Sequence, residues 1–255
     1  MKALVFAAGL GTRLKPFTLH APKALYPLCG RPLLYWTVLK LKRSGLVDGI
    51  TVNVHHFASM IEEYLASEDF LSMSQGLDVS VSDESGCLLE TGGGMLFAEK
   101  HLSGGPFIMH NSDIVSNADL TALATAHDCG SMATLLVSER ESSRYLLFDS
   151  GPYLCGWYNA STGEVRSPLG KIDPRDFRML AFSGIHTASP GIFDCARDLG
   201  FSGKFSIVDL YVSACASYRI KAFVQENLVL ADAGRPDNMR KAEQIVEKYY
   251  NFVEE

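Results

Sequence analysis

The chain has 255 residues, 47% of them apolar, and a formal net charge of −6 at pH 7. This size and apolar content suit one full-sized α/β domain and exclude a disordered chain, which would be poorer in apolar residues. The acidic balance argues against a nucleic-acid-binding protein, and no apolar run reaches the ~20 residues that span a membrane. The amino terminus lacks a signal-peptide pattern, and the six cysteines form no closely spaced pair, so we expect a cytoplasmic protein with reduced thiols.

Strand and helix patterns alternate along the first 140 residues. We expect strands over residues 2–7, 50–54, 77–81, 107–109, 132–137, 181–187, 219–225 and 228–230. We expect helices over residues 32–43, 58–66, 95–101, 120–127, 207–217 and 236–250. The alternation predicts an α/β fold of Rossmann-like, doubly wound type, with a mainly parallel mixed sheet and helices on both faces.

The pattern and composition of the sequence change between about residues 140 and 180. Residues 145–148 and 153–158 read as a hairpin around a Ser-Gly-Pro turn, and residues 160–178 are polar and contain several glycines and prolines. No linker separates two independent units, so we expect a single domain over residues 1–255. The segment 140–180 is then a small β and loop insertion that covers the ligand site.

The most informative segment is the apolar run over residues 4–8 and the glycine-containing loop that follows it. Eight cationic side chains precede Asp48, the first acidic residue, although the chain as a whole is acidic. Close backbone approach at glycines, combined with fixed positive charge, is a way to hold a compact polyanion such as a triphosphate. We therefore expect a phosphate loop with Arg13 and Lys23 beside it. The alternative is an ordinary tight turn in which both cations are solvated.

The loop resembles two known phosphate-binding motifs but matches neither of them. The run Gly9-Leu10-Gly11-Thr12-Arg13-Leu14 has leucine where the dinucleotide fingerprint needs its third glycine for close packing of helix and strand. The Gly-Lys-Ser/Thr of a P-loop is also absent. The loop is therefore a phosphate cradle of a different type.

Two aspartates follow apolar strand patterns. Asp113 comes after the strand at 107–109, and Asp232 comes after the run 228–231. Carboxylates at such strand ends converge on the ligand crevice of an open parallel sheet, and Mg²⁺ is usually bound by one or two carboxylates together with substrate phosphate. The pair predicts a magnesium site. The alternative is ordinary cap or turn chemistry.

The run Leu89-Glu90-Thr91-Gly92-Gly93-Gly94 precedes a helical pattern. Its glycines would let backbone N–H groups approach a ligand, and Glu90 would accept hydrogen bonds from sugar hydroxyls. The alternative is a glycine-rich start of a helix. A basic residue should also meet a sugar phosphate, and the polar insertion offers Lys171 and Arg178.

The longest pattern resembles a known family. The residues are Ala7-Ala8-Gly9-x-Gly11-Thr12-Arg13-Leu14-x-Pro16, then Pro22-Lys23-x-Leu25, Asn111-Ser112-Asp113 and Asp232-Ala233-Gly234-x-Pro236. This set resembles the sugar-1-phosphate nucleotidyltransferases. The Leu-Glu-Thr-Gly-Gly-Gly run resembles the branch that includes N-acetylmuramic acid-1-phosphate uridylyltransferase. One residue departs from the family, because Ser112 stands where glycine is usual before the metal aspartate.

The resemblance implies a role for each matching position. Arg13 and Lys23 would be catalytic, and Asp113 and Asp232 would bind Mg²⁺. The implied nucleotide-binding residues are Ala7, Ala8, Gly9, Gly11, Thr12, Arg13, Lys23, Gly92 and Asn111. The residues expected at the sugar phosphate are Asn53, Glu90, Gly93, Gly184 and Lys171.

The resemblance also implies the reaction and its partners, a nucleoside triphosphate and a sugar 1-phosphate. The expected substrates are UTP and N-acetylmuramic acid 1-phosphate or a related hexose 1-phosphate. Mannose 1-phosphate with GTP and phosphocholine with CTP remain alternatives. So does a non-catalytic sensor of nucleotide sugars, for which Ser112 is the support. The protein is expected to be a monomer or a homodimer.

Overall fold

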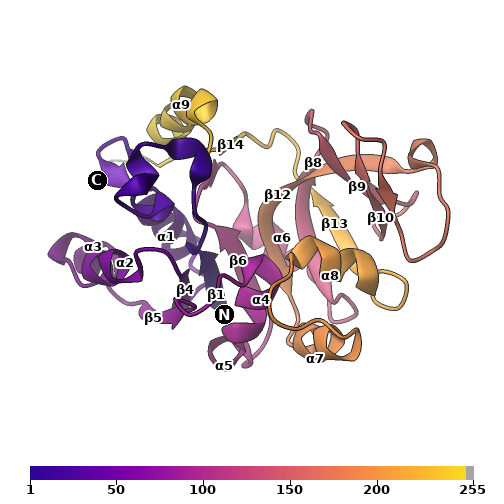
Figure 1. The fold of residues 1–255 in the computed structure, drawn as a ribbon, viewed down its shortest axis with the longest axis horizontal. Helices are drawn as coiled ribbons and strands as arrows, with labels where there is room; N and C mark the ends of the chain where they lie inside the picture. The colour runs from indigo at the N-terminus through magenta and orange to yellow at the C-terminus, as the bar shows by residue number, and fades with distance from the viewer. Residues whose placement is uncertain (251–255) are drawn as a thin grey trace.

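The computed structural model describes residues 1–250, and Figure 1 shows how its elements are arranged. The strands are β1 (Lys2–Phe6), β2 (Pro27–Leu28), β3 (Arg31–Pro32), β4 (Gly49–Val54), β5 (Asp78–Asp83), β6 (Phe107–Asn111), β7 (Ile114–Ser116), β8 (Ala133–Ser138), β9 (Arg144–Phe148), β10 (Leu154–Asn159), β11 (Val165–Arg166), β12 (Arg178–Ala188), β13 (Ile220–Val224) and β14 (Leu230–Asp232). The α-helices are α1 (Leu33–Arg43), α2 (Ala58–Leu65), α3 (Glu68–Ser74), α4 (Glu90–Phe97), α5 (Glu99–Leu102), α6 (Leu120–Ala126), α7 (Gly191–Asp198), α8 (Ile207–Ala214) and α9 (Met239–Tyr249).

Residues 1–250 contain a mixed sheet of ten strands, of which seven form the centre of the molecule and β9, β10 and β11 form a branch. Strands β5, β4, β1 and β6 lie side by side and run parallel. Strand β12 continues the sheet antiparallel to β6, then β8 pairs antiparallel with β12, and β13 pairs parallel with β8. The expected doubly wound, mainly parallel mixed sheet is confirmed.

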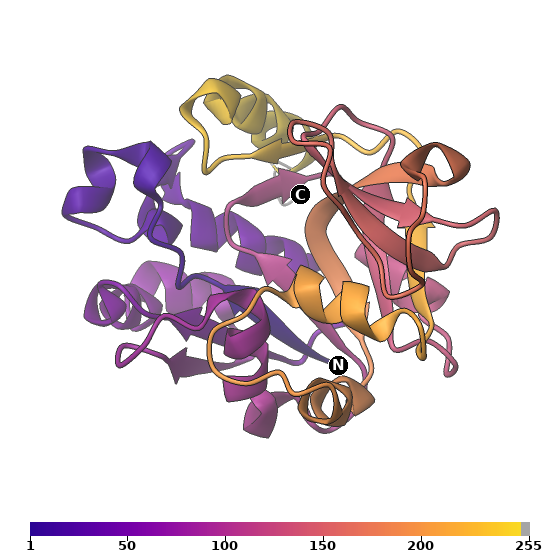
Figure 2. The same ribbon diagram turned by 45° about the vertical axis from the view of Figure 1, so that its right-hand side comes forward.

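Helices cover both faces of this sheet because its strands are apolar on both sides. In β1, Leu4 and Phe6 point into one core with α4, α5, α7 and α8, whereas Ala3 and Val5 point into a second core with α1, α2, α3 and α6. Alternate side chains of a strand face opposite sides, and parallel strands buried on both faces are apolar throughout. Figure 2 shows α7 and α8 on the near face of the sheet.

The insertion forms a side sheet that branches from β12. Residues 178–180 of β12 pair with β9, which pairs with β10, which pairs with β11, all antiparallel. The remainder of β12 stays in the central sheet, and its register with β8 shifts between Phe182 and His186. Gly184 lies within this irregularity with φ +76°, a conformation that glycine adopts without strain. The side sheet thereby forms a wall next to the ends of the central strands.

The sequence patterns missed several elements or their limits. The helix expected at 95–101 is two helices, and the first begins at Glu90, so Gly92, Gly93 and Gly94 are helical. Glycine is a poor helix former, and tertiary packing overrides that preference here. Helices α3 and α7 were not expected, the helix at 207 ends at Ala214, and the last helix begins with a 3-10 turn at residues 236–238.

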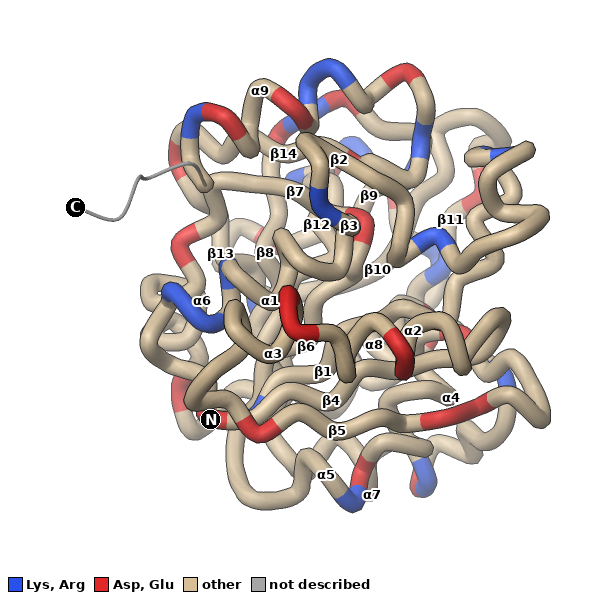
Figure 3. The backbone as a smooth tube through the Cα atoms, turned by 90° about the vertical axis from the view of Figure 1, so that its left-hand side faces the viewer, with Lys and Arg blue, Asp and Glu red and all other residues tan. Residues whose placement is uncertain are grey.

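The distribution of charged residues and the character of the helices agree with what the composition of the chain indicates. Figure 3 shows that the positions of positive and negative residues are interspersed along the backbone. Among residues 1–250, no helix combines the length and the apolar character needed to cross a membrane.

Candidate active site

The loop after β1 is shaped by two glycines that allow Lys23 to lie against it. Gly11 has φ +59°, and a Cβ there would stand 2.8 Å from the Cβ of Lys23 and 2.9 Å from Cγ2 of Thr18. A Cβ on Gly9 would stand 3.3 Å from the Lys23 ammonium. Thr18 fixes the loop, because its hydroxyl donates to the carbonyl oxygen of Gly11 at 2.9 Å. The small residues thus bring the loop backbone and the Lys23 ammonium together.

Lys23 reaches from this loop to Asp113. The ammonium donates to Oδ2 of Asp113 at 2.6 Å, and the two side chains are only 16% and 10% exposed. Burial alone would raise the pKa of Asp113, but the charge and hydrogen bond of Lys23, with a contribution from Arg13, lower it below its usual range. Asp113 is therefore a carboxylate at neutral pH.

Asp232 is brought beside Asp113 by the short antiparallel pair of β7 and β14. In this pair Asp232 lies opposite Ile114, and the N–H of Ala233 donates to the carbonyl oxygen of Asp113 at 2.8 Å. Oδ2 of Asp232 lies 3.2 Å from Nε of Arg235 and 3.7 Å from a terminal nitrogen of Arg13. The two cations and two carboxylates expected from the sequence therefore meet at one place.

The two carboxylates share a cradle that a divalent ion would fit. A Cβ on Gly234 would stand 2.7 Å from Oδ2 of Asp113 and 2.9 Å from Oδ1 of Asp232. Both carboxylates therefore face the same small space, which the missing side chain leaves open. Hard carboxylate oxygens are the donors that Mg²⁺ prefers. Within residues 1–250 no third metal-ligating side chain joins them, so further ligands would come from phosphate and water.

A cavity of about 280 Å³ opens on the Lys23 side of this cluster. Six of the residues expected at the substrates line it, together with the expected metal ligand Asp113: Ala8, Gly9, Lys23, Asn53, Glu90 and Asn111. Phe6, Leu88 and Thr91 complete the lining. Ala7 does not line it, because its side chain is buried and its N–H donates to the carbonyl oxygen of Asn53 at 3.0 Å.

Glu84 was missed by the sequence analysis and organises this cavity. Its carboxylate accepts hydrogen bonds from the amide of Asn53 and, at 2.9 Å, from the N–H of Leu89. Burial raises the pKa of Glu84. The residue thus connects the end of β4 to the segment that carries Glu90. Its position at the end of the strand pattern 77–81 was the available signal, because Asn53 ends the neighbouring strand at the same edge.

The glycine run has a different role from the one expected. The N–H groups of Gly92 and Gly93 donate to the carbonyl oxygen of Phe205 at 2.9 and 3.3 Å, so they are not free for a ligand. A Cβ on Gly93 would stand 2.0 Å from the carbonyl oxygen of Gly203, and one on Gly92 would strike the Phe205 ring. The glycines allow α4 to pack against the 203–205 segment. The assignment of Gly92 and Gly93 to the substrates stays a prediction.

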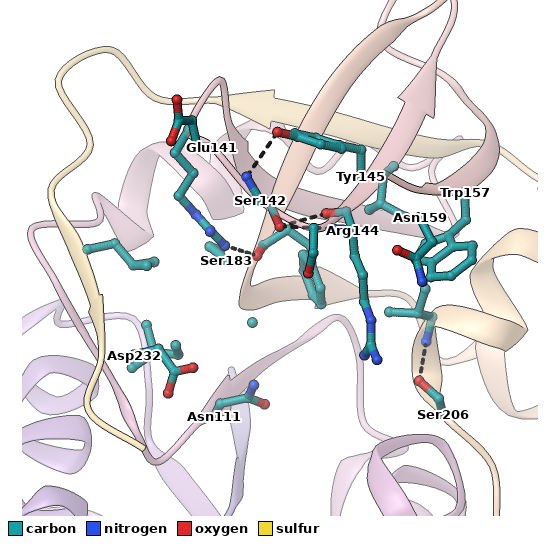
Figure 4. A pocket seen from close by; sticks show the side chains of 18 of the residues that line it. Asn111, Glu141, Ser142, Arg144, Tyr145, Trp157, Asn159, Ser183, Ser206 and Asp232 are labelled. Atoms are coloured by element: carbon teal, nitrogen blue, oxygen red, sulfur yellow. Dashed lines mark hydrogen bonds between the residues drawn. The ribbon is translucent and has the colours of Figure 1, made fainter. Parts of the chain in front are cut away.

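A second, larger cavity of about 1110 Å³ lies on the Asp232 side, between the central sheet and the side sheet (Figure 4). Its cationic lining residues are Arg13, Arg140, Arg144, Arg166, Arg235 and Lys241. Asn111 and Gly184 also line it, and Asn111 borders both cavities. The close approach of these two residues needs the glycine, because a Cβ on Gly184 would stand 2.5 Å from the Asn111 amide.

The basic residues proposed from the insertion are not at either cavity. Lys171 is exposed and lines neither of them, and its assignment to the sugar phosphate stays a prediction without support from the cavity linings. Arg178 is also outside and pairs with Glu139 at 2.9 Å. Arg144 and Arg166 from the side-sheet strands, with Arg140 just before them, are the cationic residues of this region that line the large cavity. They were missed because no motif surrounds them.

Ser112, which departs from the family pattern, does not intrude on the site. Its side chain is fully buried and lines neither cavity, and its carbonyl oxygen accepts a hydrogen bond from Thr37 at 3.3 Å. Ser112 lies in the turn between β6 and β7, and its buried hydroxyl has no hydrogen-bond partner among residues 1–250, whereas Asn111 and Asp113 on either side of it line the cavities. The feature that favoured a non-catalytic sensor therefore has no effect on the lining of either cavity.

Comparison with known proteins agrees with this geometry. The family model described as nucleotidyl transferase matches residues 2–152. The chain belongs to this family. It is similar to N-acetylmuramate alpha-1-phosphate uridylyltransferase of Caulobacter vibrioides, with 31% identity over 89% of each chain. It is also similar to the mannose-1-phosphate guanylyltransferase catalytic subunit beta of Xenopus tropicalis, with 28% identity over 76% of this chain and 51% of that protein.

Solved structures of nucleotidyltransferases share the fold. The UDP-glucose pyrophosphorylase of Acinetobacter baumanii superposes with a TM-score of 0.77 at 16% identity, over 99% of this chain and 95% of that one. The inositol-1-phosphate CTP transferase of T. maritima gives 0.74 at 17% identity, over 97% and 96%. The expected membership of the sugar-1-phosphate nucleotidyltransferases is confirmed, and the chain is a nucleotidyltransferase.

Proposed function

We propose that this nucleotidyltransferase transfers a uridylyl group from UTP to N-acetylmuramate 1-phosphate, forming a nucleotide sugar for cell-envelope synthesis and releasing pyrophosphate. The observation that carries the proposal is the position of the charged cluster. Lys23 and Asp113 border the small cavity, Arg13 and Asp232 border the large one, and the two cavities share Asn111. A triphosphate and a sugar phosphate in these cavities would meet at the cluster.

The proposed reaction needs no general base. The second pKa of a phosphate monoester is near ~6, so the sugar 1-phosphate is already mostly dianionic at neutral pH. One of its oxygens attacks the α-phosphorus of the triphosphate. The bond between the α-phosphorus and the bridging oxygen breaks, and pyrophosphate leaves with that electron pair. Positioning and neutralisation of charge therefore supply most of the rate, as in other phosphoryl transfers.

The residues of the cluster have separate tasks in this mechanism. Lys23 neutralises charge on the phosphoryl oxygens on the side of the small cavity, and Arg13 does so on the side of the large cavity. Asp113 and Asp232 would hold Mg²⁺, which when bound supplies further neutralisation of the phosphate oxygens. The backbone at Ala8 and Gly9 forms the wall of the small cavity against which the nucleoside would lie.

A substrate grid tests the proposal. The purified protein is incubated with UTP, GTP, CTP or dTTP against N-acetylmuramate 1-phosphate, N-acetylglucosamine 1-phosphate, mannose 1-phosphate or phosphocholine, and pyrophosphate release is measured. We expect the highest rate with UTP and N-acetylmuramate 1-phosphate, and loss of release when EDTA removes divalent ions. A maximum with GTP and mannose 1-phosphate would support the relationship to the guanylyltransferases instead. No release with any combination would contradict catalysis.

A further inference from the structure

The large cavity has cationic side chains at two separate places, within a lining that also contains the acidic residues Glu141, Glu164, Asp209 and Asp232. Around Asp232 stand Arg13 and Arg235, both within 4 Å of its carboxylate. The second place is on the side sheet, where Arg144 lies opposite Asn159 in the pair of β9 and β10. Figure 4 shows the Arg144 side chain reaching into the cavity between Asn111 and Ser206, on the other side of the cavity from Asp232.

Arg144 differs from its cationic neighbour Arg166 in having no side-chain partner among residues 1–250. Arg166 donates to Asp209 at 2.6 Å, and its guanidinium lies 3.9 Å over the ring of Trp157. These contacts neutralise Arg166 and fix it as part of the wall. The guanidinium of Arg144 makes no hydrogen bond or ion pair with any residue that the structure describes, residues 1–250. Its five N–H donors and its charge are therefore available to a ligand.

We propose that the side-sheet end of the large cavity binds an acidic substituent of the sugar, a carboxylate carried in addition to the 1-phosphate, and that Arg144 recognises it. This inference rests on the proposed function and specifies its sugar. The 1-phosphate has to reach the α-phosphorus beside Asp113 and Asp232, so it occupies the end of the cavity away from Arg144. A cation at the opposite end matches a substrate that is negatively charged at both ends.

The size and chemistry of the cavity agree with such a substrate. Its volume of about 1110 Å³ leaves room for a substituent beyond a plain hexose phosphate, since pockets for drug-sized ligands measure about 300–1,000 Å³. A guanidinium pairs with a carboxylate through two parallel hydrogen bonds, which gives directional recognition. Trp157 and Leu146 supply apolar wall next to Arg144. The site therefore favours N-acetylmuramate 1-phosphate over N-acetylglucosamine 1-phosphate, which lacks the carboxylate-bearing ether.

The test compares these two sugar phosphates with the wild type and Arg144→Gln. Kinetic constants are measured with UTP and Mg²⁺, and binding of each sugar phosphate alone is measured by titration calorimetry. Arg175→Gln is the matched control, because Arg175 is 87% exposed and pairs with Asp173 two residues away. We expect Arg144→Gln to raise KM and Kd for the acidic sugar by about tenfold or more, the loss typical of a hydrogen bond to a charged group, with little change for the neutral sugar.

Each other outcome would overturn the inference. An equal loss for both sugars would mean that Arg144 binds the shared 1-phosphate, and no loss would mean that it binds neither group. A wild type that prefers the neutral sugar would also contradict it. If the wild type releases no pyrophosphate with any substrate, the proposed function fails, but the calorimetric comparison still decides whether Arg144 reads the carboxylate.

Discussion

The ammonium of Lys23 lies 2.6 Å from a carboxylate oxygen of Asp113, across 90 residues of sequence, and both side chains are largely buried. Asp113 is one of the two carboxylates that would hold Mg²⁺. Lys23 therefore competes with the metal for the same oxygen as long as no phosphate draws the ammonium away. Binding of the metal and of the triphosphate should be linked through this residue.

Replacing Lys23 with methionine separates its two effects. Turnover should fall by about 10²–10³-fold, the cost of removing one preorganised charge-stabilising donor. The free protein should bind Mn²⁺ more tightly, because the ammonium that pairs with Asp113 is removed. Pyrophosphate release and Mn²⁺ titration by electron paramagnetic resonance measure the two quantities. Lys15→Met, an exposed lysine of the same loop outside both cavities, should change neither. Unchanged turnover in Lys23→Met would remove Lys23 from the mechanism.

The Gly234→Ala variant tests the cradle between the two aspartates. Its Cβ would stand 2.7 Å from Asp113 and 2.9 Å from Asp232, so the carboxylates must move apart. We expect weaker Mn²⁺ binding and a large loss of turnover, with the far-ultraviolet circular dichroism preserved. Gly104→Ala is the matched control, because a Cβ there meets nothing within 4 Å. If Gly234→Ala binds Mn²⁺ as the wild type does, the metal is not held between these carboxylates.

The glycine run should matter for stability. In Gly93→Ala the Cβ would stand 2.0 Å from the backbone oxygen of Gly203, which cannot rotate away as a side chain can. The helix must shift from the 203–205 segment, and we expect a loss of about 1–3 kcal/mol or more in the free energy of unfolding. Urea denaturation measures this loss. The same substitution at Gly86, where nothing lies within 4 Å, should cost far less. Equal stability of the two variants would contradict the packing role.

His186 should make the fold sensitive to acid. Burial, with a smaller contribution from His110, lowers the pKa of His186 to about 3. Neither ring nitrogen has a hydrogen-bond partner among the described residues. The unfolded chain takes up a proton below about pH 6.5 and the folded chain does not, so stability falls as the pH falls from about 6.5 toward 3.

Replacing His186 with leucine should therefore flatten the dependence of stability on pH in this window. One such histidine accounts for about 2–3 kcal/mol at pH 4.5. At pH 7 the variant should be about as stable as the wild type, since two unpaired buried nitrogens are removed. Urea denaturation at pH 7 and 4.5 measures both effects. The exposed His20→Leu should keep the wild-type slope, and the same slope in His186→Leu would contradict the argument.

The central strands and the charged cluster could be predicted from the sequence because their signals are local. Each of these signals comes from neighbouring residues: the apolar run of β1, the glycine loop that follows it, and an aspartate at the end of an apolar strand pattern. The helical glycines of α4 could not be predicted, because what requires them is the distant segment at Phe205. Arg144 could not be predicted either. Its position depends on how the side sheet branches from β12, and this is decided by long-range pairing.

Mg²⁺-dependent chemistry at Asp113 is the central element of the proposed mechanism. The decisive measurement is the incorporation of labelled pyrophosphate into UTP from the nucleotide sugar, with the wild type, Asp113→Asn and the surface control Arg175→Gln. The proposed mechanism predicts exchange by the wild type and the control only when Mg²⁺ is present, and a rate lower by about 10²-fold or more in Asp113→Asn. Undiminished exchange by Asp113→Asn, or exchange by the wild type without any divalent ion, would contradict it.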